Sequence, residues 1–305
     1  MSALLKFSCL QTALNYRKAA IIFFIAVLTT LSHASELSTS ANNKLENVSA
    51  PDTQQQVQRI IYGSYPFFTP NFLTPRLKYF ADYVEEVTKL SVKIEVATSY
   101  EEFLRKAREG QYDLAYAPSH FALDLIRHHN FQPLLTSNYH YQSIIISKRT
   151  SDYYSINDLA QTTIAIPNPY ALVTRAAQID IRNSGNHSTI TYQIQSTHDR
   201  TVMAVLQNKA NAGVISSGAY DSLSASMKNK LKVIHRLGDY PDDFLLMNTK
   251  GKLAGWSPIQ LAQNYIDTAG PQAYQTVWGS SEGQFIHGRS VNIDALAPFM
   301  PPGSE

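Results

Sequence analysis

Residues 59–120 read RIIYGSYPFF (59–68), FLTPRLKYFADYVEEVTKL (72–90), VKIEVAT (92–98), SYEEFLRKAREG (99–110) and YDLAYAPSH (112–120), with short joints between them. Runs rich in β-branched and aromatic residues alternate with amphipathic segments, which predicts the order βαβαβ. Open α/β sheets bind ligands at the carboxyl ends of their strands. The aromatic and small polar residues that follow the outer two strands therefore predict one wall of a small-molecule site.

The sequence of both helices in this unit indicates how they pack or where they end. In the first, apolar residues recur at helical spacing between residues 73 and 87 with charged residues on the other face, so one face is expected to pack on the sheet. The second begins with Ser99 and has Glu102 three residues later, as in a capping box, and it ends at Gly110. Glycine can adopt the left-handed conformation that closes a helix.

A second α/β unit follows the first. SIIIS at 143–147 is typical of a buried parallel strand. The strand-like TTIAIP, TITYQIQ and ANAGVIS alternate with helical segments, one of them opened by Asn168 and Pro169. LKVIHRL, DYPDD and FLLMN then lead to two expected helices within 257–268 and 271–278, long enough to return to the first unit. Two lobes joined by two crossings would enclose a cleft, a common place for small-molecule sites.

The N-terminal segment reads as a secretory signal peptide, with basic residues, an apolar run at 19–31 and the small-x-small sequence SHA. The run is shorter than the roughly 20 residues of a membrane-spanning helix, so cleavage is favoured over an uncleaved anchor. The expected organisation is a signal peptide at 1–34, a flexible polar leader at 35–58, lobe 1 at 59–140 and 241–298, lobe 2 at 141–240, and a tail at 299–305.

Composition excludes several functions. The signal segment holds three of the 26 basic residues, none of the 24 acidic residues and the single cysteine, which leaves 23 basic and 24 acidic residues. Such a chain offers no basic surface for nucleic acid, and it forms no disulfide. Zinc motifs, the Walker sequence and G-x-G-x-x-G are missing from it. We therefore expect no nucleic-acid partner, no metal and no cofactor.

Candidate site residues stand at strand ends and helix starts. Tyr65, Phe67 and Tyr116 could form a wall that stacks on a ligand, although single aromatic residues at such positions more often belong to the core. Asn168 and His198 follow strands of the second lobe, where the free N–H groups of a helix start attract an anionic or polar group. Most helix caps are merely structural, and His198 has the equally plain interpretation of a surface residue.

One motif points to a different class of protein. GSSEG at 279–283 matches G-x-S-x-G, which would make Ser281 the nucleophile of a hydrolase. It follows a helical segment, whereas the nucleophile elbow requires a strand before the serine. The hydrolase is therefore the less favoured interpretation.

Four segments resemble, in their order and spacing, the phosphate/phosphite/phosphonate-binding periplasmic proteins of ABC importers: GSYPFFTP (63–70), ATSYEEFLRKAREGQYDLAYAPSHF (97–121), YQSIIISKR (141–149) and STHDRTVMAVLQNKANAGV (196–214). The resemblance extends from about residue 59 to residue 248. It implies the α/β, two-lobe type II periplasmic binding protein fold, in which each lobe is a mixed, mostly parallel sheet flanked by helices. It also implies a cleft that closes on its ligand and no catalytic activity.

The resemblance places Phe67 and Tyr116 on the first-lobe wall and His198 on the second. Family members that bind phosphonate usually carry a Ser-Thr-Ser-like cluster at a helix start, whereas this chain reads NPYALV at 168–173. An acidic residue that often follows the late strand is replaced near Ser217. Each lost charge-assisted hydrogen bond is worth roughly 1.5 to 3 kcal/mol, so we expect a different or more organic ligand than phosphonate.

The sequence thus predicts a monomeric periplasmic solute-binding protein, not an enzyme, that delivers a small ligand to an inner-membrane ABC permease. A protein that senses the ligand and signals to a membrane receptor or histidine kinase would use the same cleft and is the alternative. The expected ligand-binding residues are Tyr65, Phe67, Tyr116, Ser119, Asn168, Tyr170, Ala171, His198 and Ser217.

Overall fold

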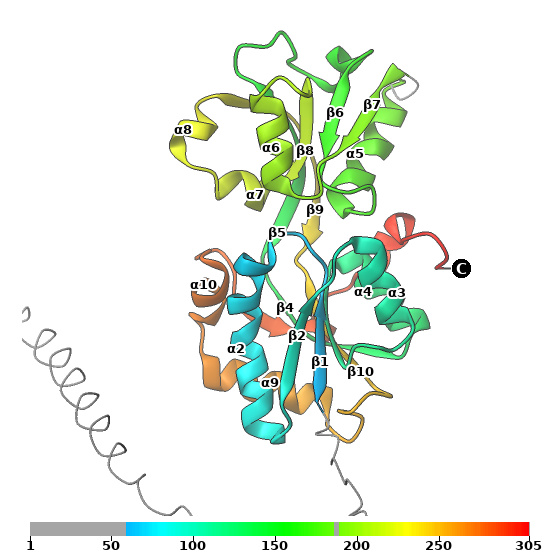
Figure 1. The fold of residues 1–305 in the computed structure, drawn as a ribbon, viewed down its shortest axis with the longest axis vertical. Helices are drawn as coiled ribbons and strands as arrows, with labels where there is room; N and C mark the ends of the chain where they lie inside the picture. The colour runs from blue at the N-terminus through cyan, green and yellow to red at the C-terminus, as the bar shows by residue number, and fades with distance from the viewer. Residues whose placement is uncertain (1–58, 186–188, 305) are drawn as a thin grey trace, which may run out of the picture. The chain divides into compact units, whose positions relative to one another are not determined.

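Two β-sheets organise the chain (Figure 1). The computed structural model describes residues 59–185 and 189–304, which fall in one unit, so the predicted signal peptide and leader lie outside the described residues. The first sheet has the order β11-β4-β10-β3-β1-β2 and the second β7-β6-β8-β5-β9. The strands of the first sheet are β1 (Ile60–Ser64), β2 (Val92–Val96), β3 (Leu114–Ala117), β4 (Phe131–Ser137), β10 (Phe244–Asn248) and β11 (Phe285–His287). Those of the second are β5 (His140–Lys148), β6 (Thr163–Ile166), β7 (Thr191–Ile194), β8 (Ala212–Ser216) and β9 (Leu231–Pro241).

Helices flank both sheets, and we call each sheet with its helices a lobe. The first lobe contains α2 (Pro70–Thr88), α3 (Tyr100–Arg108), α4 (Ser119–His128), α9 (Pro258–Ala269) and α10 (Ala273–Trp278). The second contains α5 (Leu172–Asn183), α6 (His198–Leu206), α7 (Ser217–Asp221) and α8 (Ala225–Lys228). Short 3-10 helices cover Ile156–Leu159, Gly288–Ser290 and Asp294–Phe299. Among the helices of the described ranges, none has both the length and the apolar character needed to cross a membrane.

The predicted α/β class is confirmed, and so is the opening βαβαβ order. The sheets are mixed but not mostly parallel as expected, because two of the five pairings in the first sheet and two of the four in the second are parallel. β1 pairs in parallel with both β2 and β3, as strands joined by helical crossovers do. Ser99 caps α3 by accepting a hydrogen bond from the backbone N–H of Glu102 at 3.0 Å. Gly110 has a φ of +70°, so the expected left-handed residue stands just beyond the end of α3.

Two local predictions in the second lobe are wrong. The helix expected to open at Asn168 begins at Leu172 instead, because Asn168 Oδ1 accepts a hydrogen bond from Tyr170 N at 2.8 Å and holds a turn. The SIIIS segment within β5 is buried as expected, but it pairs antiparallel with β8 and β9. Burial on both faces selects the same apolar residues in either direction, so composition did not reveal the orientation.

The two lobes are joined by two crossings that lie side by side. The chain passes from β4 to β5 at residues 137–140 and returns from β9 to β10 at residues 241–244. Ser137 Oγ donates to Asp242 Oδ2 at 2.6 Å, and Asp242 N donates to Tyr139 O at 3.2 Å, so the crossings are bonded to each other. We propose that the boundaries between the lobes lie in these two crossings, near residues 140 and 241.

The last described residues fold back on the first lobe. Arg108 of α3 donates to Pro302 O at 3.1 Å and to Ser304 Oγ at 3.0 Å, and its Nε donates to the fully buried Asp124 of α4 at 2.9 Å. Arg108 therefore joins α3, α4 and the C-terminal segment in one network.

Candidate functional site

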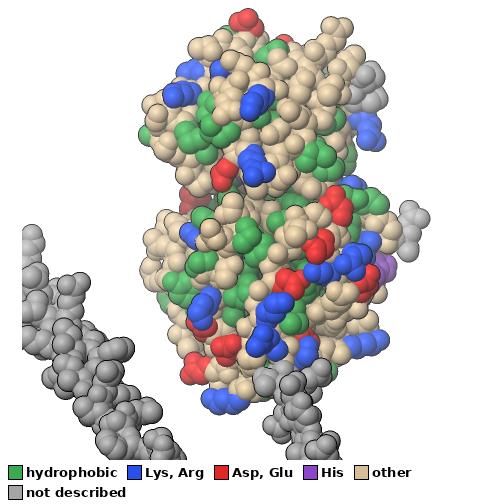
Figure 2. All heavy atoms as spheres, viewed as in Figure 1, with side chains coloured by type: hydrophobic (Ala, Val, Ile, Leu, Met, Phe, Trp, Pro, Cys, Tyr) green, Lys and Arg blue, Asp and Glu red, His purple; other side chains and the backbone are tan. Residues whose placement is uncertain are grey.

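A cleft of about 680 Å³ lies between the lobes, well inside the range of roughly 300 to 1,000 Å³ that is typical of small-molecule sites. The space-filling view shows the groove between the lobes, bordered on this face by hydrophobic, acidic and basic side chains (Figure 2). Its lining comes from the strand ends of the first lobe, the crossings, the end of α10 and the helix starts of the second lobe.

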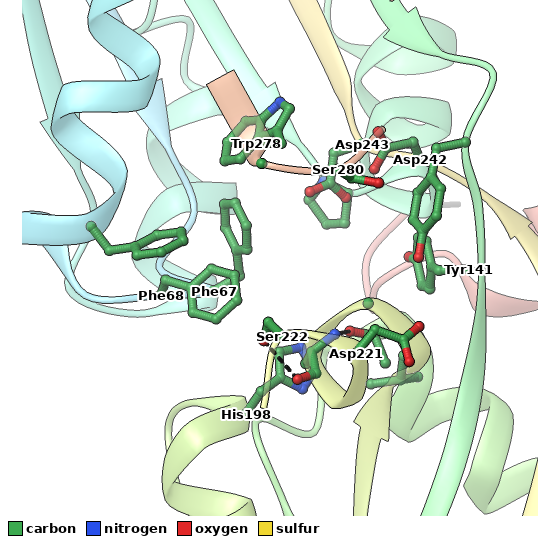
Figure 3. Close-up of a pocket in the computed structure, with 18 of the residues that line it drawn as sticks. Phe67, Phe68, Tyr141, His198, Asp221, Ser222, Asp242, Asp243, Trp278 and Ser280 are labelled. Atoms are coloured by element: carbon green, nitrogen blue, oxygen red, sulfur yellow. Dashed lines mark hydrogen bonds between the residues drawn. The ribbon is translucent and has the colours of Figure 1, made fainter. Parts of the chain in front are cut away.

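One wall of the cleft is a row of aromatic rings. The centroids of Tyr65 and Phe67 lie 4.6 Å apart, those of Phe67 and Tyr116 5.9 Å, and those of Tyr116 and Trp278 5.4 Å, all in stacked orientations. Tyr65 follows β1, Tyr116 belongs to β3 and Trp278 ends α10, so three separate parts of the chain build the row. Phe67 and Trp278 are only half-buried and present ring surface to the cleft (Figure 3).

The opposite wall includes His198 at the start of α6. Thr197 caps this helix, so His198 is the first helical residue, and its ring centroid lies 6.4 Å from that of Phe68 across the cleft. The side chain is 8% exposed, and its Nδ1 has no hydrogen-bond partner among the described residues. Burial lowers the pKa of His198 to about 4, so the imidazole is neutral near pH 7. It presents an unsatisfied polar atom at a site with room for a ligand.

Two adjacent carboxyl groups stand beside the crossings (Figure 3). The hydroxyl of Tyr65 donates to Asp243 Oδ2 at 2.5 Å, whereas Asp242 Oδ2 accepts from Ser137 and from Tyr274 Oη, at 2.7 Å for the latter. Burial raises the pKa of Asp243 well above its usual value, and the negative charge of Asp242 raises it further. Burial also raises the pKa of Asp242.

The lysine, arginine, aspartate and glutamate content of the described cleft lining is entirely acidic. None of the described residues that line the cleft is a lysine or an arginine. Five of them are acidic: Asp199, Asp221, Asp242, Asp243 and Glu282. Asp199, Asp221 and Glu282 are exposed at the rim of the cleft, whereas Asp243 is 9% exposed.

The start of α5 also faces the cleft. Ala171, Leu172 and Val173 line it, and the N-cap residue Ala171 makes no side-chain cap hydrogen bond. The first N–H groups of a helix have no partner within the helix. They are available to a polar ligand group, but the side chains around them are apolar.

The structure brings five of the nine expected residues to the cleft: Tyr65, Phe67, Tyr116, Ala171 and His198. The other four lie elsewhere. Ser119 is fully buried at the start of α4, and Asn168 holds the turn before α5. Tyr170 lines a separate surface hollow beside α3, and Ser217 Oγ accepts from Gln142 N of β5 at 2.9 Å.

Sequence reasoning missed the residues of the second crossing and of α10. Asp242 and Asp243 stood in DYPDD, which had been interpreted only as a connection, and Trp278 closed an expected helix without any ligand signal. The GSSEG segment lines the cleft through Ser280, Ser281 and their neighbours, but it follows α10 and not a strand, so it lacks the setting of a hydrolase elbow. Within residues 59–185 and 189–304, no three or more His, Cys, Asp or Glu side chains are grouped to hold a metal.

A second buried histidine joins the lobes behind the cleft. His120 of α4 is fully buried and donates from Nε2 to the carbonyl oxygen of Tyr170 at 2.8 Å. Burial lowers its pKa to about 3, whereas an exposed histidine titrates near 6.5. Between these values the unfolded chain binds a proton that the folded protein does not, so this group makes stability fall as the pH falls.

We expect His120→Gln, which keeps an N–H donor for Tyr170, to reduce the loss of stability between pH 7 and pH 5 by about 2 kcal/mol. Urea unfolding of both proteins at the two pH values measures this difference. Asp242 and Asp243, whose raised pKa values act in the opposite direction, are present in both proteins and cancel. Equal losses of stability would show that His120 does not resist protonation in the folded protein.

Comparison with known proteins gives a family and a fold. The family model described as "ABC transporter, phosphonate, periplasmic substrate-binding protein" matches residues 62–254. PhnD1 from Prochlorococcus marinus, solved in complex with methylphosphonate, has a TM-score of 0.64 at 13% identity over 75% of this chain and 92% of its own. A binding protein component of an ABC phosphonate transporter from Pseudomonas aeruginosa has a TM-score of 0.59 at 15% identity over 78% and 83%.

A third similar structure, Tv2483 bound to L-arginine, has a TM-score of 0.57 at 11% identity over 78% of this chain and 96% of its own. At such identities the likeness concerns the fold alone. A search of curated protein sequences gave no match.

Proposed function

This chain belongs to the phosphonate family of periplasmic substrate-binding proteins of ABC transporters, and from that premise we propose that it captures a small organic ligand other than a simple phosphonate. Members of the family bind substrate for a transporter and are not enzymes. The two-lobe type II periplasmic binding protein fold expected from the sequence is confirmed, since two mixed sheets flanked by helices match the solved relatives.

The interlobe cleft with its aromatic row carries the proposal. A ligand that fills about 680 Å³ beside Phe67, Tyr116 and Trp278 would bury ring surface on both partners. The start of α5, where the resemblance to phosphonate-binding members implies a hydroxyl cluster, is apolar in this chain at Ala171 and Leu172. The solved relatives hold methylphosphonate in one case and L-arginine in another, so the fold does not select the ligand and the lining side chains must.

Five of the expected residues would contact this ligand directly: Tyr65, Phe67, Tyr116, Ala171 and His198. Ser119, Asn168, Tyr170 and Ser217 would act through the shape of the walls, because none of them lines the cleft. Closure of the two lobes on the ligand would give an inner-membrane ABC permease the loaded form to recognise.

A thermal-shift screen over oxyanions, phosphonates, amines and aromatic acids tests capture. A ligand at 100 times its dissociation constant stabilises a protein by about 2.7 kcal/mol, which raises the melting temperature measurably. Uptake of the hit, labelled with carbon-14, is then compared between cells with and without the gene. We expect uptake to fall in the deleted strain. Unchanged uptake with a lost transcriptional response would contradict transport and support a sensor.

A further inference from the structure

We propose that the ligand carries a positive charge, which the carboxylate of Asp243 receives beside the aromatic row of the cleft. This inference rests on the proposed function, because it names the chemical class of the ligand that the same cleft would hold.

Asp243 is placed to receive a cation. It lines the cleft in the crossing between β9 and β10, and the Tyr65 hydroxyl supplies the one hydrogen bond that the described residues give to its carboxylate. Ion pairs with lysine, arginine or histidine are missing for Asp243 within the described ranges. A buried carboxylate without a cationic partner is costly to ionise, and a bound cation would remove that cost.

Arg76 does not form an ion pair with Asp243. Arg76 of α2 lines a small cavity that also touches Asp243, but its guanidinium carbon lies 3.5 Å from the Phe72 ring centroid and its Nη1 donates to Phe72 O at 2.9 Å. Phe72 therefore holds the guanidinium, whose Nε is buried without a hydrogen-bond partner among the described residues, and no ion pair joins it to Asp243. Asp243 interacts electrostatically with the carboxyl of Asp242 and with the hydroxyls of Tyr65, Tyr100, Tyr116, Tyr141 and Tyr274, and all of these residues line the cleft.

The aromatic row suits the same ligand class. Ring faces attract cations, most strongly where water is excluded, and tryptophan does so best. Phe67, Tyr116 and Trp278 stand in one stacked row that ends near the acidic crossing (Figure 3). Across the cleft, the neutral His198 leaves Nδ1 unsatisfied although it is more than nine-tenths buried, which marks a polar contact that the protein itself does not fill. The three acidic residues at the rim would draw a cation in.

An anion without a compensating cation fits this lining poorly. It would meet five carboxyl groups and, among the described lining residues, no lysine or arginine. The competing possibility is a protonated Asp243 that donates a hydrogen bond to an oxyanion. The two possibilities predict opposite pH dependences of affinity, because a cation needs the ionised form of Asp243 and an oxyanion needs the protonated form.

Titration calorimetry of the wild-type protein with probes that differ in charge separates the bound cation from the bound oxyanion. The probes that carry a positively charged group, which we call cationic probes, are 2-phenylethylamine, L-arginine, choline and the zwitterion L-phenylalanine. The probes without a positive charge are 3-phenylpropanoate, 2-phenylethanol and methylphosphonate. We expect binding by at least one cationic probe, at least tenfold tighter than by any probe of the second group. Its affinity should rise with pH, by up to about tenfold per unit, over the range in which Asp243 of the free protein loses its proton.

Asp243→Asn keeps an oxygen that accepts from Tyr65 and removes the charge, and it should weaken the cationic probe at least tenfold and flatten its pH dependence. Asp239→Asn is the matched control, since this β9 residue is 74% exposed and outside the cleft. Tighter binding of methylphosphonate or 3-phenylpropanoate than of every cation would overturn the inference and leave the proposed function standing. If no probe of either group bound in calorimetry and no compound raised the melting temperature in the wider screen, the inference and the proposed function would both fail.

Discussion

Trp278→Ala should weaken binding of the ligand by about 30-fold or more, because an aromatic face in a closed cleft contributes roughly 2 kcal/mol and each 1.4 kcal/mol is a factor of ten. Trp278 stands at the end of α10, stacked on Tyr116 at 5.4 Å and 6.0 Å from Phe67. Its loss would open the aromatic row to water. Calorimetric titration of the wild-type protein and the variant with the same probe measures the effect.

The chain offers a matched control. Its other tryptophan, Trp256, is 39% exposed and does not line the cleft. Trp256→Ala should therefore leave the affinity unchanged within about twofold, the usual range for a residue that the ligand does not touch. An affinity of Trp278→Ala within twofold of the wild type would remove the aromatic row from the site.

Arg108→Ala should lower the free energy of unfolding by about 3 to 5 kcal/mol, the cost of leaving a buried charge without its partner. Asp124, which accepts from Arg108 Nε, has no exposed surface, and its other basic neighbour is His129, whose Nε2 lies 3.9 Å from Asp124 Oδ2 and is charged only when protonated. The same substitution removes the hydrogen bonds to Pro302 O and Ser304 Oγ. Urea unfolding followed by circular dichroism reports the change.

Arg105 of the same helix provides the comparison. It pairs with Glu109 at 2.6 Å, but both side chains are about half exposed. Surface pairs of this kind are worth about 0 to 1 kcal/mol, so Arg105→Ala should change stability by no more than that. Equal losses for the two variants would show that the burial of Asp124 is not what makes the Arg108 contact strong.

The helices and strands could be predicted from the sequence, because the caps and periodic patterns that mark them depend on residues close together in the chain. Ser99 and Gly110 mark the ends of α3 through hydrogen bonds and backbone conformation that depend on near neighbours alone. Tyr65 and Tyr116 were found from the rule that ligands gather at the carboxyl ends of parallel strands. The prediction that a helix begins at Asn168 is wrong because an asparagine that can cap a helix can equally hold a turn. Only the following residues select between the two.

The acidic half of the site could not be predicted in this way. Asp243 meets Tyr65 across 178 residues of chain, and Trp278 meets Tyr116 across a similar span. No periodicity or cap relates such positions, so only the return of the chain to the first lobe places them together. The absence of lysine and arginine from the described lining is likewise a property of the assembled cleft and not of any one segment.

The fluorescence of Trp278 can report directly whether ligand binds in the interlobe cleft. In a Trp256→Phe protein, Trp278 is the remaining tryptophan, and its ring forms part of the cleft lining. Addition of a ligand that raises the melting temperature should give a saturable change in its emission, with the same dissociation constant as calorimetry. If the ligand stabilises the protein and leaves the emission of Trp278 unchanged, it binds outside the cleft, and the site built from Phe67, Asp243 and His198 is wrong.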